Sequence, residues 1–350
     1  MSEKYVAYVG TYTHEQSEGI YVYDIDLKTG VLTERSVAYI NNPSYLCVSN
    51  DGKYVYSIAD EGVAAFAIGA NGDLNKINQA WIGGMRGCHV EVDSKNRFLF
   101  VGGYHDGRVT MMKLNRDGSI RGIADGIFHQ GMAISATERR LDHPKVTCVK
   151  LTPDERFLCA ADYGLNQVKV YEIDYRVGKL RLVDIIRCGM DSAPRALRFS
   201  KNGKFCYILT ELANNIEVYK YDVKDNEPEF EKIQDAKVCD EENFAYASSS
   251  MALTFDGNYL FISIDGLNEV AIFSVNEETG LLEKLQSTPC SGYFPKSLAI
   301  LPGNEFYAVL NHDSDEIRTF HVNYKDNYSL MVNPPIACAK PNCIRLHKLS

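Results

Sequence analysis

The chain has 350 residues and a formal net charge of −9 at pH 7, and 45% of its residues are hydrophobic. This acidic balance argues against general nucleic-acid binding, which needs a basic face. No apolar run is long enough to span a membrane, and the N-terminus shows no signal-peptide core. The composition therefore predicts a cytoplasmic globular protein with no membrane or nucleic-acid partner.

A short sequence motif recurs along the chain: a charged or polar residue, then an aromatic residue, then an apolar run. The aromatic residues that mark the copies are Tyr5, Tyr54, Phe98, Phe157, Phe205, Tyr259 and Phe306. Successive marks are 49, 44, 59, 48, 54 and 47 residues apart, which is the spacing expected of β-propeller blades. Seven marks predict seven blades.

Each mark sits inside a regular unit of four predicted strands. A short apolar strand and a tight turn precede the marked strand, as in residues 45–48 and the Asn50-Asp51-Gly52 turn. An alternating strand and an outer strand follow it, as in residues 19–24 and 31–34. Because the units run from end to end without a linker, residues 1–350 are expected to form one all-β domain, a seven-bladed β-propeller with four-stranded blades.

The two ends of the chain predict how the ring closes. The first mark is Tyr5, so the first blade lacks its innermost strand. The segment from Pro341 to Leu346 resembles the innermost strand around Tyr45 and is spare at the C-terminus. We therefore expect the C-terminal strand to complete the first blade.

Cysteines and cofactor motifs give mostly negative information. Cys47, Cys159, Cys206 and Cys343 lie inside apolar strands, and no C-x-x-C occurs, which favours buried thiols in a reducing compartment. The sequence has no metal-ligand cluster, no Gly-rich phosphate loop and no Gly-x-Ser-x-Gly elbow. It predicts neither a metal nor a cofactor, and it leaves the oligomeric state open.

Polar residues at the strand ends predict where a ligand binds. In each blade the innermost strand begins, and the marked strand ends, at one mouth of the central channel. Counting ten residues back from each mark gives a first ring, and counting six forward gives a second ring. The first ring is Ser44, Cys88, Thr147, Arg195, Ser249 and Lys296, with Asn342 from the closing strand; the second is Thr11, Asp60, Tyr104, Tyr163, Glu211, Asp265 and His312. A channel mouth of this kind is the default ligand site of the architecture.

Within these rings, Arg195 and Glu211 lie symmetrically about a predicted turn and should face each other across a hairpin. One interpretation is an ion pair that only stabilises the blade. The other is an arginine that binds an anion or polarises a carbonyl beside a carboxylate that activates water. Arg86, Lys145 and Lys296 are expected near the same face, and they favour the second interpretation because they would hold a phosphate or carboxylate.

Several ordered fragments resemble the 6-phosphogluconolactonase family of seven-bladed propellers. They are Gly10-Thr11-Tyr12-Thr13, Asn42-Pro43-Ser44-Tyr45-Leu46, Gly87-Cys88-His89-Val90, Ala193-Pro194-Arg195 and Thr210-Glu211-Leu212, and the resemblance extends through all seven blades. It implies hydrolysis of 6-phospho-glucono-1,5-lactone in the cytosol. A related branch of the family forms and opens lactones of muconates.

The chain also departs from this family. Thr147, Ala196, Ser250 and Ala252 stand where the family usually has histidine or glutamate. Of a catalytic trio of histidine, arginine and glutamate, only Arg195 and Glu211 remain. His89 matches the family and either assists catalysis or locks the third blade, whereas the loop residue His143 is expected to be exposed.

The 59-residue step between the third and fourth marks predicts an insert from Gly122 to Leu141. Long loops in compact folds tend to be functional, so this insert is expected to cover the mouth. The family carries an arginine at the position of Arg139.

Two functions from different classes follow. The first is a sugar-phosphate lactonase, with Arg195, Glu211 and His89 as catalytic residues. Its substrate-binding residues are Lys296, Tyr104, Arg86, Thr147 and Arg139. The second is a catalytically eroded propeller that binds a small anionic ligand or a protein at the channel mouth, because fold alone does not fix function.

Overall fold

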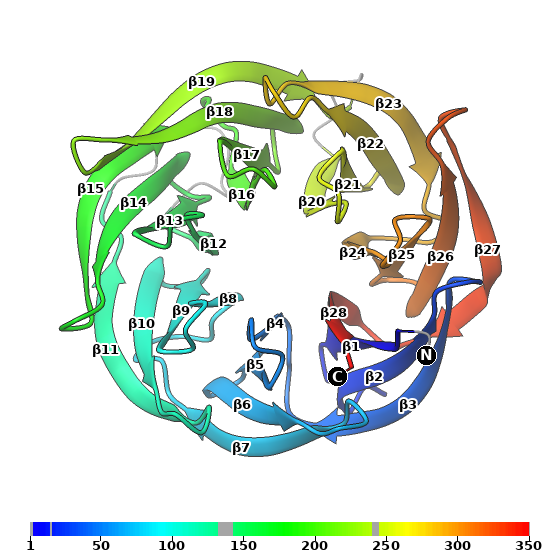
Figure 1. The fold of residues 1–350 in the computed structure, drawn as a ribbon, viewed down its shortest axis with the longest axis horizontal. Helices are drawn as coiled ribbons and strands as arrows, with labels where there is room; N and C mark the ends of the chain where they lie inside the picture. Colours follow the sequence, from blue (N-terminus) through cyan, green and yellow to red (C-terminus); the bar gives the residue numbers. More distant parts are fainter. Residues whose placement is uncertain (1–2, 15, 132–142, 240–244, 350) are drawn as a thin grey trace.

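A computed structural model describes residues 3–14, 16–131, 143–239 and 245–349. In it, seven four-stranded antiparallel sheets stand side by side around a central axis (Figure 1). Each sheet is one blade, with its strands ranged from the axis outward. The prediction of a seven-bladed, all-β propeller is confirmed.

The blades follow one another in chain order around the axis, and the strands of each run from the channel outward. The first blade is formed by β28 (Pro341–Lys348), β1 (Tyr5–Thr11), β2 (Gly19–Asp26) and β3 (Val31–Tyr39). The second is formed by β4 (Leu46–Val48), β5 (Tyr54–Ala59), β6 (Gly62–Ile68) and β7 (Leu74–Ala80). The third is formed by β8 (His89–Val92), β9 (Phe98–Gly103), β10 (Arg108–Leu114) and β11 (Ile120–Phe128). The fourth and fifth are β12 (Val146–Leu151), β13 (Phe157–Asp162), β14 (Gln167–Asp174) and β15 (Lys179–Arg187); and β16 (Pro194–Phe199), β17 (Phe205–Thr210), β18 (Asn215–Lys224) and β19 (Glu227–Lys237). The last two are β20 (Ala247–Leu253), β21 (Tyr259–Asp265), β22 (Glu269–Val275) and β23 (Leu282–Pro289); and β24 (Pro295–Ile300), β25 (Phe306–Asn311), β26 (Glu316–Asn323) and β27 (Tyr328–Ala337).

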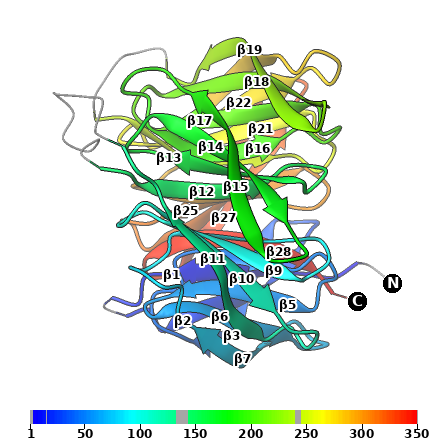
Figure 2. The ribbon, with the colours of Figure 1, turned by 90° about the vertical axis from the view of Figure 1, so that its left-hand side faces the viewer.

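The C-terminal strand closes the ring, as the sequence predicts. Strand β28 pairs antiparallel with β1 from Tyr5–Lys348 to Thr11–Pro341, and its Cys343 and Ile344 side chains are buried. The two chain ends therefore lie close together, on one side of the disc (Figure 2). Edge pairing of this kind removes the free strand edge that an open sheet would expose.

The core lies between neighbouring blades. One buried cluster, for example, joins Val9 of the first blade to Leu310 of the seventh. Buried tyrosines on the marked strands add polar contacts across the same interfaces. Tyr8 donates a hydrogen bond to the carbonyl oxygen of Gly72 at 2.8 Å, and Gly72 lies in a turn of the second blade with a φ of 93°. That φ favours glycine, so a glycine in this turn presents the carbonyl oxygen that Tyr8 of the neighbouring blade binds.

The predicted insert between the third and fourth blades starts too early. Gly122 to Phe128 belongs to β11, the outer strand of the third blade, and Asp125 pairs there with Met111. The blade requires this fourth strand, which the long spacing concealed. Arg139 lies outside the described residues, so a cover over the mouth and a role for Arg139 remain predictions.

Candidate functional site

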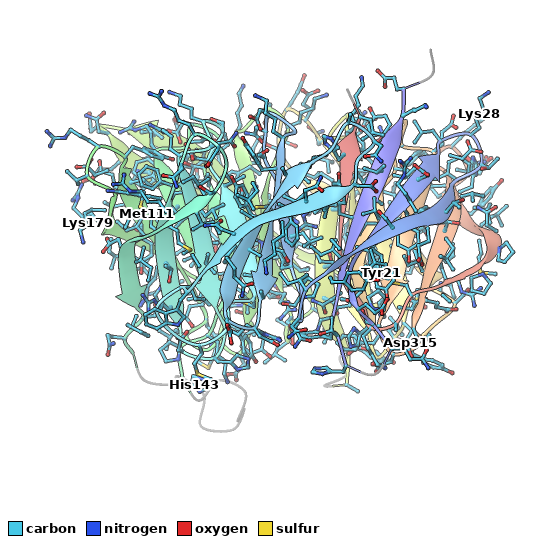
Figure 3. All side chains as sticks on the ribbon, turned by 90° about the horizontal axis from the view of Figure 1, so that it is seen from below. Tyr21, Lys28, Met111, His143, Lys179 and Asp315 are labelled. Atoms are coloured by element: carbon cyan, nitrogen blue, oxygen red, sulfur yellow. The ribbon has the colours of Figure 1, made fainter. Side chains whose placement is uncertain are left out.

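A cavity of about 880 Å³ occupies the channel between the innermost strands. All seven residues of the predicted first ring line it: Ser44, Cys88, Thr147, Arg195, Ser249, Lys296 and Asn342. This ring lies where the innermost strands begin. His143, which precedes the innermost strand β12, lies on the same face of the disc as Asp315, and Lys28 lies on the opposite face (Figure 3). The channel mouth is therefore the candidate site.

A β-bulge places a first-ring residue at the mouth in five of the blades. The strand register shifts by one residue around Thr147, Arg195, Ser249, Lys296 and Asn342, each of which lacks a ladder partner on its neighbouring strand. A bulge leaves the extra residue out of the ladder and redirects its side chain, and bulges are common beside active sites. The repeated bulge releases these five residues from the ladder, and the side chains of all five line the cavity.

Arg195 and Glu211 form an ion pair at the cavity wall. Nη1 of Arg195 is 3.3 Å from Oε2 of Glu211, and Oη of Tyr163 donates a hydrogen bond to Oε1 of Glu211 at 3.3 Å. Burial acts to lower the pKa of Arg195, but the Glu211 carboxylate and the neighbouring Cys88 and tyrosine groups together raise it above its ordinary value. The side chains remain 26% and 19% exposed, so a ligand in the cavity can reach both.

The backbone that carries this pair is held in an uncommon conformation. Ala193 has a φ of 56°, which is rare for a residue other than glycine. Its amide donates to Oδ1 of Asn166 at 2.8 Å, and its carbonyl accepts from the amide of Glu211 at 2.9 Å. These two bonds fix the entry to β16, and with it the position of Arg195.

Lys296 of β24 contributes a second cation. Its Nζ lies 4.4 Å from the ring centroid of Phe294, and among the described residues no carboxylate oxygen is within 4 Å of it. Burial, followed by the charge of Arg195, lowers the pKa of Lys296 to about 8, although Glu211 and Asp265 act in the opposite direction. The charge of Lys296 therefore changes within a pH range that an assay can cover.

His89 lines the cavity but is bound into its wall. Its Nδ1 accepts a hydrogen bond from the amide of Val149 at 3.4 Å, and its Nε2 lies 3.5 Å from Sγ of Cys148. The ring packs on Tyr45, with centroids 4.1 Å apart. Burial, then the charge of Arg198, holds the pKa of His89 well below its ordinary value. A neutral His89 thus joins the third blade to the fourth, and its predicted catalytic role remains a prediction.

Of the other predicted binding residues, Arg86, Tyr104 and Thr147 are described by the structure, and all three line the cavity. Arg86 pairs with Asp60, Nη1 to Oδ1, at 3.3 Å, and its guanidinium lies 4.9 Å from the ring centroid of Tyr12. Tyr104 lies beside Lys145, whose Nζ is 5.7 Å from the centroid of its ring. Oγ1 of Thr147 donates to the carbonyl oxygen of Pro194 at 3.0 Å. Thr147 therefore links the fourth and fifth blades.

The second predicted ring is only partly correct. Of its seven positions, only Tyr104, Glu211 and Asp265 are among the described residues that line the cavity. The marked strands lie one strand farther from the axis, by about 4.8 Å, so most of their end residues bond locally. Thr11, for example, donates to the carbonyl oxygen of Gly19 at 2.8 Å, and Nδ1 of His312 lies 3.1 Å from the carbonyl oxygen of Pro341.

Several cavity residues were not predicted, among them one tyrosine and two arginines. Tyr12 lies at the mouth, whereas Arg198 and Arg345 lie farther along the innermost strands. A signal for the two arginines exists in the sequence, because each is a charged residue between two apolar residues, three positions after a first-ring residue. Ala196, Ser250 and Ala252 also line the cavity, with small side chains.

Metal, membrane and thiol features complete the description. Across residues 3–14, 16–131, 143–239 and 245–349, no group of three His, Cys, Asp or Glu side chains is placed to hold a metal ion. In the same part of the chain, no helix is long and apolar enough to cross a membrane. Cys47, Cys159, Cys206 and Cys343 are buried thiols, as the sequence predicts.

Comparison with known proteins identifies the family. The family model described as "Lactonase, 7-bladed beta-propeller" matches residues 6–346. A 6-phosphogluconolactonase of Bacillus subtilis is 27% identical over 99% of both chains, and one of Formosa agariphila is 30% identical over 89% of this chain and 91% of that relative. The periplasmic gluconolactonase of Pseudomonas aeruginosa has the same fold, with a TM-score of 0.92 at 24% identity over 99% of this chain and 100% of its own. The chain therefore belongs to the lactonase family of seven-bladed β-propellers.

Proposed function

We propose that this protein hydrolyses 6-phospho-glucono-1,5-lactone to 6-phosphogluconate. The observation that carries the proposal is the Arg195–Glu211 pair, accessible in the channel of a lactonase-family propeller. The relatives named 6-phosphogluconolactonase support this substrate. Buried thiols such as those of Cys47 and Cys159 favour a reducing cytoplasm as its location.

In this mechanism Glu211 acts as the general base. It accepts a proton from a water molecule whose oxygen attacks the lactone carbonyl carbon. Arg195 donates hydrogen bonds to the carbonyl oxygen, whose negative charge grows in the tetrahedral intermediate. The bond between that carbon and the ring oxygen then breaks, the ring oxygen takes up the proton, and the open acid ionises. Lys296 supplies further positive charge for the anionic substrate.

The decisive measurement is the disappearance of freshly generated 6-phospho-glucono-1,5-lactone, corrected for its spontaneous hydrolysis. Disappearance well above the rate in buffer is expected. A rate equal to that in buffer, across a panel of sugar-phosphate lactones, would instead favour an eroded propeller that binds an anion. Thr147, Ala196, Ser250 and Ala252 are the substitutions that favour that second function.

Lys296 should make product binding depend on pH. Between pH 7 and pH 9 folded Lys296 loses its proton, because its pKa of about 8 lies below the usual 10.5. The phosphate of the product is already largely ionised above pH 7, so its charge stays nearly constant. The dissociation constant for 6-phosphogluconate, measured by calorimetry, should rise about tenfold over this range, as expected for one lost proton.

The matched variant is Lys296→Met, which keeps an unbranched side chain only one atom shorter and removes the charge. It should bind 6-phosphogluconate more weakly at pH 7 and show little change up to pH 9. The lowered pKa of Lys296 also makes the free energy of unfolding depend on pH. Between about pH 8 and 10.5 the unfolded chain retains the proton that the folded chain has lost, so the contribution of Lys296 to the free energy of unfolding rises with pH. An unchanged pH dependence in the variant would exclude Lys296 as its source.

A further inference from the structure

Two arginines lie in the cavity below the mouth. Arg198 is on β16 and Arg345 on β28, and both line the cavity. Each is three residues along its strand from a first-ring residue, Arg195 in one case and Asn342 in the other. At about 3.3 Å per residue, this places them up to about 10 Å deeper in the channel.

Neither arginine is neutralised by a neighbouring acid. Nη1 of Arg198 donates to the carbonyl oxygen of Leu197 at 2.8 Å, and Nη1 of Arg345 donates to that of Ile344 at 2.7 Å. The guanidinium of Arg345 also lies 4.5 Å from the ring centroid of Tyr45. Among the residues that the structure describes, no carboxylate oxygen lies within 4 Å of either guanidinium, unlike that of Arg195.

The surrounding charges do not compensate for them. Glu91 of the neighbouring strand β8 is itself bound to Lys150 of β12. His89 is neutral, because burial and then the charges of Arg198 and Arg345 depress its pKa. Two positive charges therefore remain unbalanced inside a chain whose net charge is −9. A partly buried charge is costly unless a counter-ion accompanies it, and a ligand can provide one.

The wall between the two arginines leaves space for such a ligand. There the sixth and seventh blades, which lie between the fifth blade with Arg198 and the first blade with Arg345, contribute small side chains, including Ser250 and Ala252 of β20 and Ser297 and Ala299 of β24. This run of small residues between two arginines gives room for a compact anionic group. Planar guanidinium groups are well suited to phosphate, because they bind two of its oxygens at once.

We propose that Arg198 and Arg345 form an inner anion site that holds the phosphate of the substrate while its lactone lies between Arg195 and Glu211. This assignment rests on the proposed function. It gives the two ends of the substrate separate places, with the phosphate directed down the channel and the reacting carbonyl at the mouth. The site would therefore select phosphorylated over unphosphorylated lactones.

The kinetic test compares Arg198→Met and Arg345→Met with the wild type on glucono-1,5-lactone with and without a phosphate at carbon 6. The ratio of kcat/KM for the phosphorylated to the unphosphorylated lactone should fall about 10- to 100-fold in each variant, the effect of a lost charge-assisted hydrogen bond. The control is Arg181→Met, which removes an exposed arginine paired with Glu172 on the outer strands. It should leave the ratio unchanged. An unchanged ratio in both channel variants would overturn the inner site.

A binding test separates this site from the proposed activity. The dissociation constants of 6-phosphogluconate and gluconate are measured by calorimetry. The wild type should bind 6-phosphogluconate at least about tenfold more tightly, because the phosphate adds at least one charge-assisted hydrogen bond. The Arg198→Met variant should lose this preference. Preference for the phosphate without lactone hydrolysis would refute the proposed function and keep the inner site. Hydrolysis without that preference would refute the inner site alone. Because Arg198 lies away from the ring closure, its variant keeps the test valid even where Arg345→Met folds poorly.

Discussion

Glu211→Gln should lower the turnover of 6-phospho-glucono-1,5-lactone by about 10²- to 10⁴-fold, the range typical of a lost general base. Glutamine keeps the shape of the side chain and the hydrogen bond from Tyr163, but it does not accept a proton from water. The measurement is kcat from initial rates at saturating lactone, corrected for spontaneous hydrolysis. The thermal unfolding temperature should stay within a few degrees of the wild type.

Arg195→Ala is the informative comparison. Because Arg195 would contact both the bound lactone and the developing oxyanion, its removal should raise KM and lower kcat together, whereas Glu211→Gln should act mainly on kcat. The same change also leaves Glu211 without its 3.3 Å partner. A Glu211→Gln enzyme with wild-type turnover would show that another group activates the water.

Truncation before Pro341 should abolish cooperative folding. It removes the whole of β28, including the buried Cys343 and Ile344, and exposes the edge of β1. Each buried apolar side chain contributes roughly 1.5–3 kcal/mol. Together with the lost ladder and core contacts, the deficit is comparable to the roughly 5–15 kcal/mol that stabilises a typical protein. Circular dichroism on heating and size-exclusion chromatography measure the effect.

The matched control removes only residues 348–350. This deletion keeps the ladder from Pro341 to His347. It loses the exposed ion pair between Lys348 and Glu3, the partly buried side chain of Leu349 and the hydrogen bond from the amide of Leu349 to the carbonyl oxygen of Lys4. Surface ion pairs are worth little, so the unfolding temperature should fall by only a few degrees. If the chain shortened before Pro341 melted like the wild type, the closing strand would not be needed for the ring.

The fold is predictable because its signal is repeated seven times. The marked strands are buried on both faces, so Phe98 and its counterparts recur with an apolar run in every blade. The outer strands are half exposed and carry a weaker pattern. This is why the sequence assigns the segment from Gly122 to Phe128 to an insert although it forms β11.

The sequence predicts the cavity residues at the mouth of the channel but not those deeper in it. Counting from the marks finds Arg195, Glu211 and Lys296, because the strand lengths are nearly equal between blades. Counting does not reveal the bulges, which depend on hydrogen-bond register rather than on residue type. Counting also misses Arg198 and Arg345. The sequence places each of them within a buried strand, and only the structure shows that the channel is open beside them.

The bulges make the chemistry of the mouth separable from the stability of the ring. A bulged residue such as Ser249 contributes its side chain to the channel, while the residues on either side of it, Ser248 and Ser250, make the ladder contacts. Substitutions at Ser249 and Lys296 should therefore be tolerated by the framework, whereas Thr147, Arg195 and Asn342 also bond to neighbouring strands or blades. A combinatorial library confined to Ser249 and Lys296 would sample new ligand specificities on a scaffold that continues to fold.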